Sequence, residues 1–202
     1  PLFVFMGVVL EKSGLAEELL ATMGRLFGRL RGGLAISVVM VGALLAATTG
    51  VVGASVVTMA VIALPAMLNR GYAPSLASGT IAASGTLGQI IPPSIILILL
   101  GDVIGVPVGE LFIGAVVPGM LLIILYMAYI AFTAWRHPEM APAADKNDPD
   151  LPHLVLSIFK SLLPPLFLII AVLGSIFFGV ASPTESAAVG ALGALILAAL
   201  NK

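Results

Sequence analysis

Long apolar stretches separated by short polar segments dominate the chain. Residues 34–68 and residues 71–101 contain no Asp, Glu, Lys, Arg or His. Arg70 lies between the two stretches. A membrane-crossing helix needs roughly 20 apolar residues, so both stretches are long enough to enter a bilayer. Residues 111–135 and 162–180 are similarly apolar. The pattern predicts an all-α, polytopic membrane protein.

The stretch from residue 34 to residue 68 predicts a re-entrant helical hairpin. Basic residues flank it on both sides, which places both of its ends in the cytoplasm. Two full crossings would need about 40 residues, and one crossing would put the ends on opposite sides. Small and polar residues collect at the expected tip, namely Thr48, Thr49, Gly50, Gly53, Ala54 and Ser55. One long tilted helix with a glycine kink is the alternative.

The stretch from residue 73 to residue 101 predicts a transmembrane helix that is broken in its middle. Pro92 and Pro93 have no amide hydrogen, so the carbonyls of Gly88 and Gln89 lose their helical donors. Two half-helices would then meet near the midplane. Free carbonyls at the end of the first suit a small cation, and amides at the start of the second suit an anion. A proline-kinked helix repaired by Ser and Thr hydroxyls is the alternative.

The remaining segments complete the expected topology. Residues 1–33 comprise the end of a transmembrane helix and an amphipathic helix from Leu15 to Arg31, whose apolar residues recur three or four apart. This helix lies on the membrane surface or packs on its own protein. Residues 102–135 form a short loop to residue 110 and then a transmembrane helix. Residues 136–160 form a cytoplasmic linker, and residues 161–202 form two transmembrane helices.

The turn inside residues 161–202 has the form of a helix start. Ser182 is placed as the N-cap, Pro183 as the first helical residue and Glu185 as the capping-box residue. We therefore interpret Glu185 as a cap rather than as a proton relay.

Charge and composition support this topology. It puts all 9 Lys and Arg residues on one side and leaves Asp102, Glu110 and Glu185 on the other. The chain is 60% hydrophobic and 9% charged, with no Cys and 2 His, both in a polar loop. Catalysis by Cys or His is therefore disfavoured, and we expect no enzyme, no catalytic residue, no cofactor and no nucleic-acid partner. Both ends resemble cuts through a longer chain.

The polar residues at the hairpin tip and at the break predict a site for a hard monovalent cation. Hydroxyl and carbonyl oxygens are the ligands that such ions take. Na⁺ is favoured over H⁺ because the proposed pocket has no titratable group. The candidate Na⁺ ligands are Thr48, Thr49, Gly50, Ser55, Ser84, Thr86, Gly88 and Gln89. The candidate substrate-binding residues at the start of the second half-helix are Pro92, Pro93 and Ser94.

Four motifs carry a resemblance to a known family: ATTGVVGASVV, NRGY, ASGTLGQIIPPS and SPTESAAVGAL, in that order. Together they resemble the large membrane subunit of tripartite ATP-independent periplasmic (TRAP) transporters, the DctM-like family. The resemblance implies a Na⁺-driven, elevator-type importer of organic acids in the bacterial inner membrane, built as inverted repeats. It also implies a small DctQ-like membrane subunit and a periplasmic substrate-binding protein as partners.

The resemblance assigns parts of the chain to the transporter. It makes residues 34–101 one half of the transport domain with one Na⁺ site, and residues 161–202 the start of the second repeat. Gln89 departs from the family, which often has proline there, and Thr48-Thr49-Gly50 stands where many members have Ser-Gly-Ser. A single-chain Na⁺/anion symporter and a non-transporting membrane scaffold subunit are the alternative functions.

Overall fold

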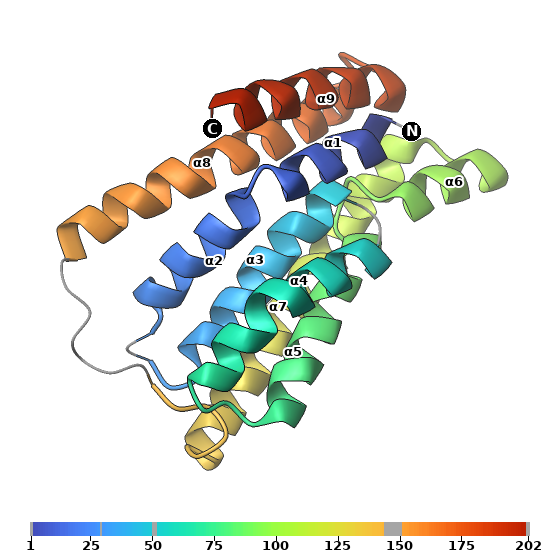
Figure 1. The fold of residues 1–202 in the computed structure, drawn as a ribbon. Helices are drawn as coiled ribbons and strands as arrows, with labels where there is room; N and C mark the ends of the chain where they lie inside the picture. Colours follow the sequence, from blue (N-terminus) through green and yellow to red (C-terminus); the bar gives the residue numbers. More distant parts are fainter. Residues whose placement is uncertain (1, 29, 50–51, 144–150, 201–202) are drawn as a thin grey trace.

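The computed structural model describes residues 2–28, 30–49, 52–143 and 151–200, and these form helices and turns without a β-strand (Figure 1). The predicted all-α class is confirmed for this part of the chain. The elements in order are α1 (Leu2–Lys12), α2 (Leu15–Leu26), α3 (Gly33–Thr49), α4 (Val52–Asn69), α5 (Pro74–Thr86), the 3₁₀ helix η1 (Leu87–Gln89), α6 (Ile95–Ile104), α7 (Val108–Arg136), α8 (Leu151–Phe177) and α9 (Pro183–Leu200).

Two hydrophobic cores divide the helices into two groups. The first core is built mainly from α3, α4, α5 and the end of α7, with α2 along its side. The second is built mainly from α1, α8 and α9. Figure 1 shows α1, α8 and α9 along one side of the molecule and α4 and α5 along the other. We call α3, α4, α5 and α7 the hairpin group, and α1, α8 and α9 the terminal group.

Helices α3 and α4 run in opposite directions and pack against each other (Figure 1). The alternative of one long tilted helix over residues 34–68 is therefore wrong. At 1.5 Å per residue, the 17 residues of α3 span about 25 Å and the 18 residues of α4 about 27 Å. Both helices are shorter than the roughly 30 Å of a bilayer's hydrocarbon core.

Helix α2 uses its apolar face to pack on the protein itself. Leu15, Leu19, Leu20 and Met23 are buried, and α2 contacts α3 and α8. The helix ends at Leu26, before the predicted end. Of the two interpretations of the amphipathic pattern, packing on its own protein accounts for the buried residues.

Three turns interlock at one end of the hairpin group. The amide of Gly32 donates to the Ala141 carbonyl at 3.1 Å, and the amide of Ala73 donates to the Met140 carbonyl at 3.0 Å. The Tyr72 hydroxyl accepts from an amide in the first turn of α3 at 3.2 Å. Burial raises the pKa of Tyr72, so the phenol stays neutral there. These bonds tie the starts of α3 and α5 to the end of α7.

Two predicted boundaries are wrong. The loop expected over residues 102–110 is confined to residues 105–107, because Asp102 lies inside α6 and Glu110 in the first turn of α7. The turn is made instead by Gly105, whose φ of 76° is the left-handed conformation that ends helices. A charged residue near a helix end does not break the helix.

The linker is also shorter than predicted. Helix α8 begins at Leu151, so the last part of the predicted segment 136–160 is helical. Proline in the first turn of a helix has no hydrogen bond to lose, so Pro152 is compatible with a helix start at this point. Polar composition suggested a linker where the backbone continues α8.

The predicted helix start at residue 182 is confirmed. The Ser182 amide donates to Glu185 Oε2 at 2.8 Å, and the Glu185 amide donates to Ser182 Oγ at 3.3 Å. The Ser182 hydroxyl also donates to Glu185 Oε2 at 2.8 Å. This reciprocal arrangement is a capping box, and it explains the position of Glu185 without a role in proton transfer.

Two helices in the described part of the chain, α4 and α7, have at least 18 residues and the apolar composition of a membrane-spanning helix, and α4 only just reaches that length. Shorter apolar helical segments cover residues 33–45, 95–104, 162–177 and 183–199. These lengths agree with a membrane protein in which some apolar helices stop short of a full crossing.

Candidate functional site

The break between α5 and α6 lies where the two prolines predicted it. After Thr86 the chain tightens into η1, and the amides of Ile90 and Ile91 both donate to the Leu87 carbonyl, at 3.0 and 2.9 Å. Helix α6 begins only at Ile95, after a segment without regular structure. The alternative of a single kinked helix is therefore wrong. The peptide bond between Pro92 and Pro93 is cis.

Ser94 closes the break from both sides. Its hydroxyl donates to the Gln89 carbonyl at 2.7 Å and accepts from the Leu97 amide at 3.4 Å. The side chain is buried, with 1% of its surface exposed. The prediction that the Gln89 carbonyl is free is therefore wrong, because Ser94 occupies one of its two lone pairs. The second lone pair remains available to an ion.

The start of α6 still offers backbone donors. The Ile98 amide donates to the Ser94 carbonyl at 3.2 Å, which begins the helical pattern. No described residue accepts from the amides of Ile95 and Ile96. Unbonded amides and the positive end of the helix dipole favour an anion at this point.

The hydroxyls at the end of α5 are bonded to their own helix. The Ser84 hydroxyl donates to the Ile81 carbonyl at 2.9 Å, and the Thr86 hydroxyl donates to the Ala83 carbonyl at 2.7 Å. Ser84 is fully buried, whereas Thr86 and Gln89 are exposed. Each hydroxyl oxygen keeps its lone pairs, so these donated bonds do not use its capacity to accept a hydrogen bond or to coordinate a cation.

Helices α3 and α4 hold the end of α5 between them. A Cβ atom added to Gly42 of α3 would lie 2.6 Å from Ser84 Cβ. A Cβ atom added to Gly85 would collide with Val56 of α4. The contacts at Ser84 and Gly85 therefore depend on glycine, and they bring the hairpin directly against the broken helix.

The structure brings together part of the predicted cation site. Ser55 is buried and precedes Val56, while Gly88 is buried in η1, which contacts both α3 and α4. Thr48 and Thr49 form the end of α3, and Gly50 lies outside the described residues. In the described part of the chain, no group of three His, Cys, Asp or Glu side chains could hold a metal ion.

A second side of the break faces an apolar cavity. A cavity of about 420 Å³ lies between α3, α7, α8 and the break, and Pro92 lines it with Ile91, Ala47 and Met120. The described residues of its lining are all apolar, without an ionisable or hydroxyl side chain among them. This cavity is unsuited to a carboxylate, so Pro92 could affect an anion site through the backbone of the break but not from this side.

Sequence reasoning missed Gly42, Gly85 and Val56 as parts of the site. Gly42 is an isolated glycine within an apolar helix, a pattern that favours close helix packing. That signal was present in the sequence. The sequence did not indicate that Gly42 contacts Ser84 of α5, because this contact joins residues far apart in the chain.

The chain matches a known family over its whole length. The sequence model of the tripartite ATP-independent periplasmic transporter, DctM component, matches residues 1–202. The C4-dicarboxylate TRAP transporter large permease protein DctM of Pseudomonas aeruginosa is 34% identical over 194 residues, which cover 95% of this chain and 44% of that protein.

Two further relatives have other named substrates. The isethionate TRAP transporter permease protein DctMQ of Oleidesulfovibrio alaskensis is 32% identical, with 98% of this chain and 30% of that protein covered. The ectoine TRAP transporter large permease protein TeaC of Halomonas elongata is 30% identical, with 98% and 45% covered. The chain spans less than half the length of these relatives. All three are named as permeases rather than as enzymes.

Proposed function

The chain belongs to the DctM component family of TRAP transporters, and from this premise we propose that it forms part of the membrane permease of a secondary importer of small organic acids. The relatives named for C4-dicarboxylates and isethionate support an acidic substrate. The relative named for ectoine indicates that the family also takes other small solutes.

The observation that carries this proposal is the α5–α6 break and its position against α3 and α4. Irregular backbone inside a bilayer persists where protein surrounds it or where it lines a polar cavity. Transporters use such half-helices to bind ions and anionic groups near the midplane. A kink that served packing alone would not need Ser84, Gly85 and Gly88 buried against a second pair of helices.

We assign Na⁺ to the carbonyl end of α5 and the organic acid to the amide end of α6. The Na⁺ ligands would come from Thr48, Thr49, Gly50, Ser55, Ser84, Thr86, Gly88 and Gln89, all of which offer neutral oxygens. The carboxylate would be held by the first amides of α6, with Pro92, Pro93 and Ser94 shaping the backbone that presents them.

The division into two cores supports an elevator mechanism. The hairpin group is tied together by the Gly42–Ser84 and Gly85–Val56 contacts and by the interlocked turns, so it can move as one body. In this mechanism α3 and α4 form a re-entrant hairpin in the inner membrane. The complete permease would work with a small DctQ-like subunit and a periplasmic binding protein that delivers the substrate.

The proposal is tested by reconstituting the complete transporter in liposomes with its binding protein. Uptake of a radiolabelled C4-dicarboxylate should require Na⁺ outside and should fall to background when choline replaces Na⁺. Uptake that is unchanged in choline would remove the Na⁺ assignment. Uptake at the full rate without the binding protein would favour a single-chain symporter instead.

A further inference from the structure

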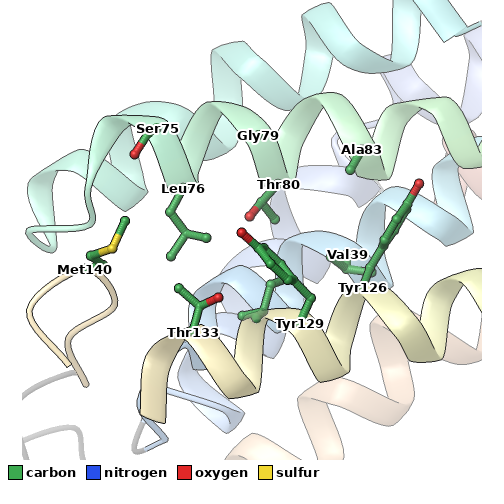
Figure 2. Close-up of a pocket in the computed structure, with 11 residues that line it drawn as sticks. Val39, Ser75, Leu76, Gly79, Thr80, Ala83, Tyr126, Tyr129, Thr133 and Met140 are labelled. Atoms are coloured by element: carbon green, nitrogen blue, oxygen red, sulfur yellow. The ribbon is translucent and has the colours of Figure 1, made fainter. Parts of the chain in front are cut away.

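A second cavity, between α5 and α7, is lined by five hydroxyl-bearing side chains. Its volume is about 510 Å³, and Figure 2 shows it between the two helices. The hydroxyl groups belong to Ser75 and Thr80 of α5 and to Tyr126, Tyr129 and Thr133 of α7. None of these five hydroxyls has a hydrogen bond to any residue that the structure describes.

Thr80 is the clearest member of the group. The residue is 5% exposed, yet its hydroxyl does not bond to the preceding turn of its helix. Other helical hydroxyls in the chain do so: Thr22 donates to the Glu18 carbonyl at 2.7 Å, and Ser78 donates to the Pro74 carbonyl at 2.8 Å. Figure 2 shows the hydroxyls of Thr80 and Tyr129 pointing toward one another across the cavity.

The Thr80 hydroxyl oxygen is exposed to this cavity. Every fully enclosed side-chain polar atom among the described residues has a hydrogen-bond partner, so an unbonded Thr80 oxygen must be open to the cavity. A donor that loses water without gaining an acceptor costs free energy. The position therefore favours a ligand that carries an acceptor.

The lining defines the chemistry of that ligand. Among the described residues that line the cavity there is no Asp, Glu, Lys, Arg or His, so its interior does not neutralise a charged group. Hydroxyl donors suit neutral acceptors such as ester carbonyls. Apolar side chains that include Val39, Leu76 and Ile130 supply the rest of the surface. The ligand is therefore an amphiphile with a neutral polar region and an apolar chain.

The position of the cavity identifies the kind of amphiphile. Tyr129 is 65% exposed, and the exposed rings of Phe132 and Trp135 lie 6.3 Å apart at the same end of α7. Exposed aromatic residues at a helix end favour the membrane–water interface. Arg136 follows Thr133 by three positions and so lies near the same face of the helix. The hydroxyl donors in the cavity match the ester carbonyls of a phospholipid, and the apolar lining matches its acyl chains. The Arg136 guanidinium just outside the cavity matches the phosphate.

We propose that this cavity is a phospholipid site of the leaflet that faces Arg136. The ester carbonyls accept from Thr80 and Tyr129, the acyl chains lie along α5 and α7, and the phosphate lies beside Arg136. The site is separate from the proposed ion and substrate site and does not depend on transport. A lipid held there would brace α5 against α7 within the hairpin group.

The test is lipid binding to the complete, delipidated transporter by native mass spectrometry, titrated with palmitoyl-oleoyl phosphatidylethanolamine. Thr80→Val, combined with Tyr129→Phe, keeps the shape of the cavity and removes two donors. It should weaken the tightest lipid-binding step roughly three- to tenfold. Ser78→Ala is the matched control on α5, since its hydroxyl bonds to its own helix, and it should leave lipid binding unchanged.

Two further measurements separate the outcomes. Arg136→Gln should weaken binding of the phospholipid but not of a diacylglycerol probe that lacks the phosphate. A Cβ atom on Gly79 would meet none of the described atoms within 4 Å, so Gly79→Cys fits at the edge of the cavity. Its thiol should react with a lipid-soluble maleimide more slowly once lipid is bound.

Two results would overturn the proposal. The first is equal lipid binding by the wild type and by the Thr80→Val/Tyr129→Phe variant. The second is a Gly79→Cys variant whose thiol is unreactive both with and without lipid, because another part of the polypeptide would then cover the cavity.

Discussion

The hairpin group and the terminal group place glycine against different partners. In the hairpin group, a Cβ on Gly85 would lie 3.0 Å from the Cα and 3.1 Å from the backbone N of Val56. In the terminal group, a Cβ on Gly190 would lie 2.6 Å from Sδ of Met6, near the end of a flexible side chain, and 2.9 Å from Cγ2 of Val172. The first clash therefore involves the Val56 backbone as well as its Cγ2, whereas the second involves side-chain atoms alone. Of these, the Met6 side chain can change rotamer.

The difference in glycine contacts between the two groups reflects which helices each group has to keep in position. The α8–α9 pair of the terminal group is joined by a side-chain bond of 2.7 Å between the hydroxyls of Ser175 and Ser186. The hairpin group instead encloses a helix that is interrupted over residues 90–94. An interrupted helix cannot hold its own position through a hydrogen-bond ladder, so neighbouring helices must do so. Close glycine contacts beside the break provide that restraint.

The largest effect is expected at Gly85. Gly85→Ala forces α4 and α5 apart at the backbone, and overpacking of this kind costs about 1–3 kcal/mol. We expect a lower midpoint of thermal unfolding for the purified full-length transporter and slower uptake in liposomes.

Two glycine variants sharpen this comparison. Gly190→Ala should cost less than Gly85→Ala, because the atoms that its Cβ would meet, in Met6 and Val172, belong to side chains rather than to the backbone. Gly79→Ala, on the same helix as Gly85, meets none of the described atoms within 4 Å and should stabilise α5 by up to about 1 kcal/mol. Equal losses at Gly85 and Gly190 would contradict the distinction between the two groups.

A smaller effect on stability but a clear one on transport is expected at the double proline. Pro92→Ala combined with Pro93→Ala restores two amide donors and favours a continuous helix through the break. Uptake should fall roughly tenfold, equivalent to about 1.4 kcal/mol. Pro65→Ala is the control, since Pro65 also lies inside a helix, α4, toward the end that is remote from Val56 and the break. Full activity in the double variant would make the break a packing feature.

The smallest of the three effects is expected at the caps. Ser94→Ala removes the cap of α6 and the partner of the Gln89 carbonyl, while Ser182→Ala removes the cap of α9. Either change should destabilise the protein by about 1 kcal/mol. Ser94→Ala should also slow the uptake of substrate, whereas Ser182→Ala should not. Parallel unfolding and uptake measurements on the two variants would show whether they separate in this way.

Much of the fold was accessible from local patterns. Apolar length predicted the helices, and the missing amides of Pro92 and Pro93 predicted the break. The wrong helix boundaries were inferred from the polar composition of a segment rather than from its backbone conformation. Asp102 was assigned to a loop because it is charged, although the backbone turns at Gly105, and polar residues near Leu151 suggested a linker where α8 begins.

The binding site itself stays a prediction, although some of its residues share one contact region. Ser84 of α5 and Gly88 of η1 are buried, and both elements contact α3 and α4. That Ser94 bonds the Gln89 carbonyl, and that Thr80 leaves its hydroxyl open to a cavity, could not be anticipated. Both depend on how the backbone places a hydroxyl relative to its neighbours, and a hydroxyl can satisfy itself in several ways.

By itself, the sequence determined the helical class, the interruption at the double proline and the cap at Ser182. Each of these rests on a covalent property or on residues within one turn of each other. The tertiary structure decided which glycines are contacts and which hydroxyls remain unbonded. Those outcomes depend on α3 packing against α4, α5 and α7, and contacts between distant residues are set by the packing of the whole group rather than by any local pattern.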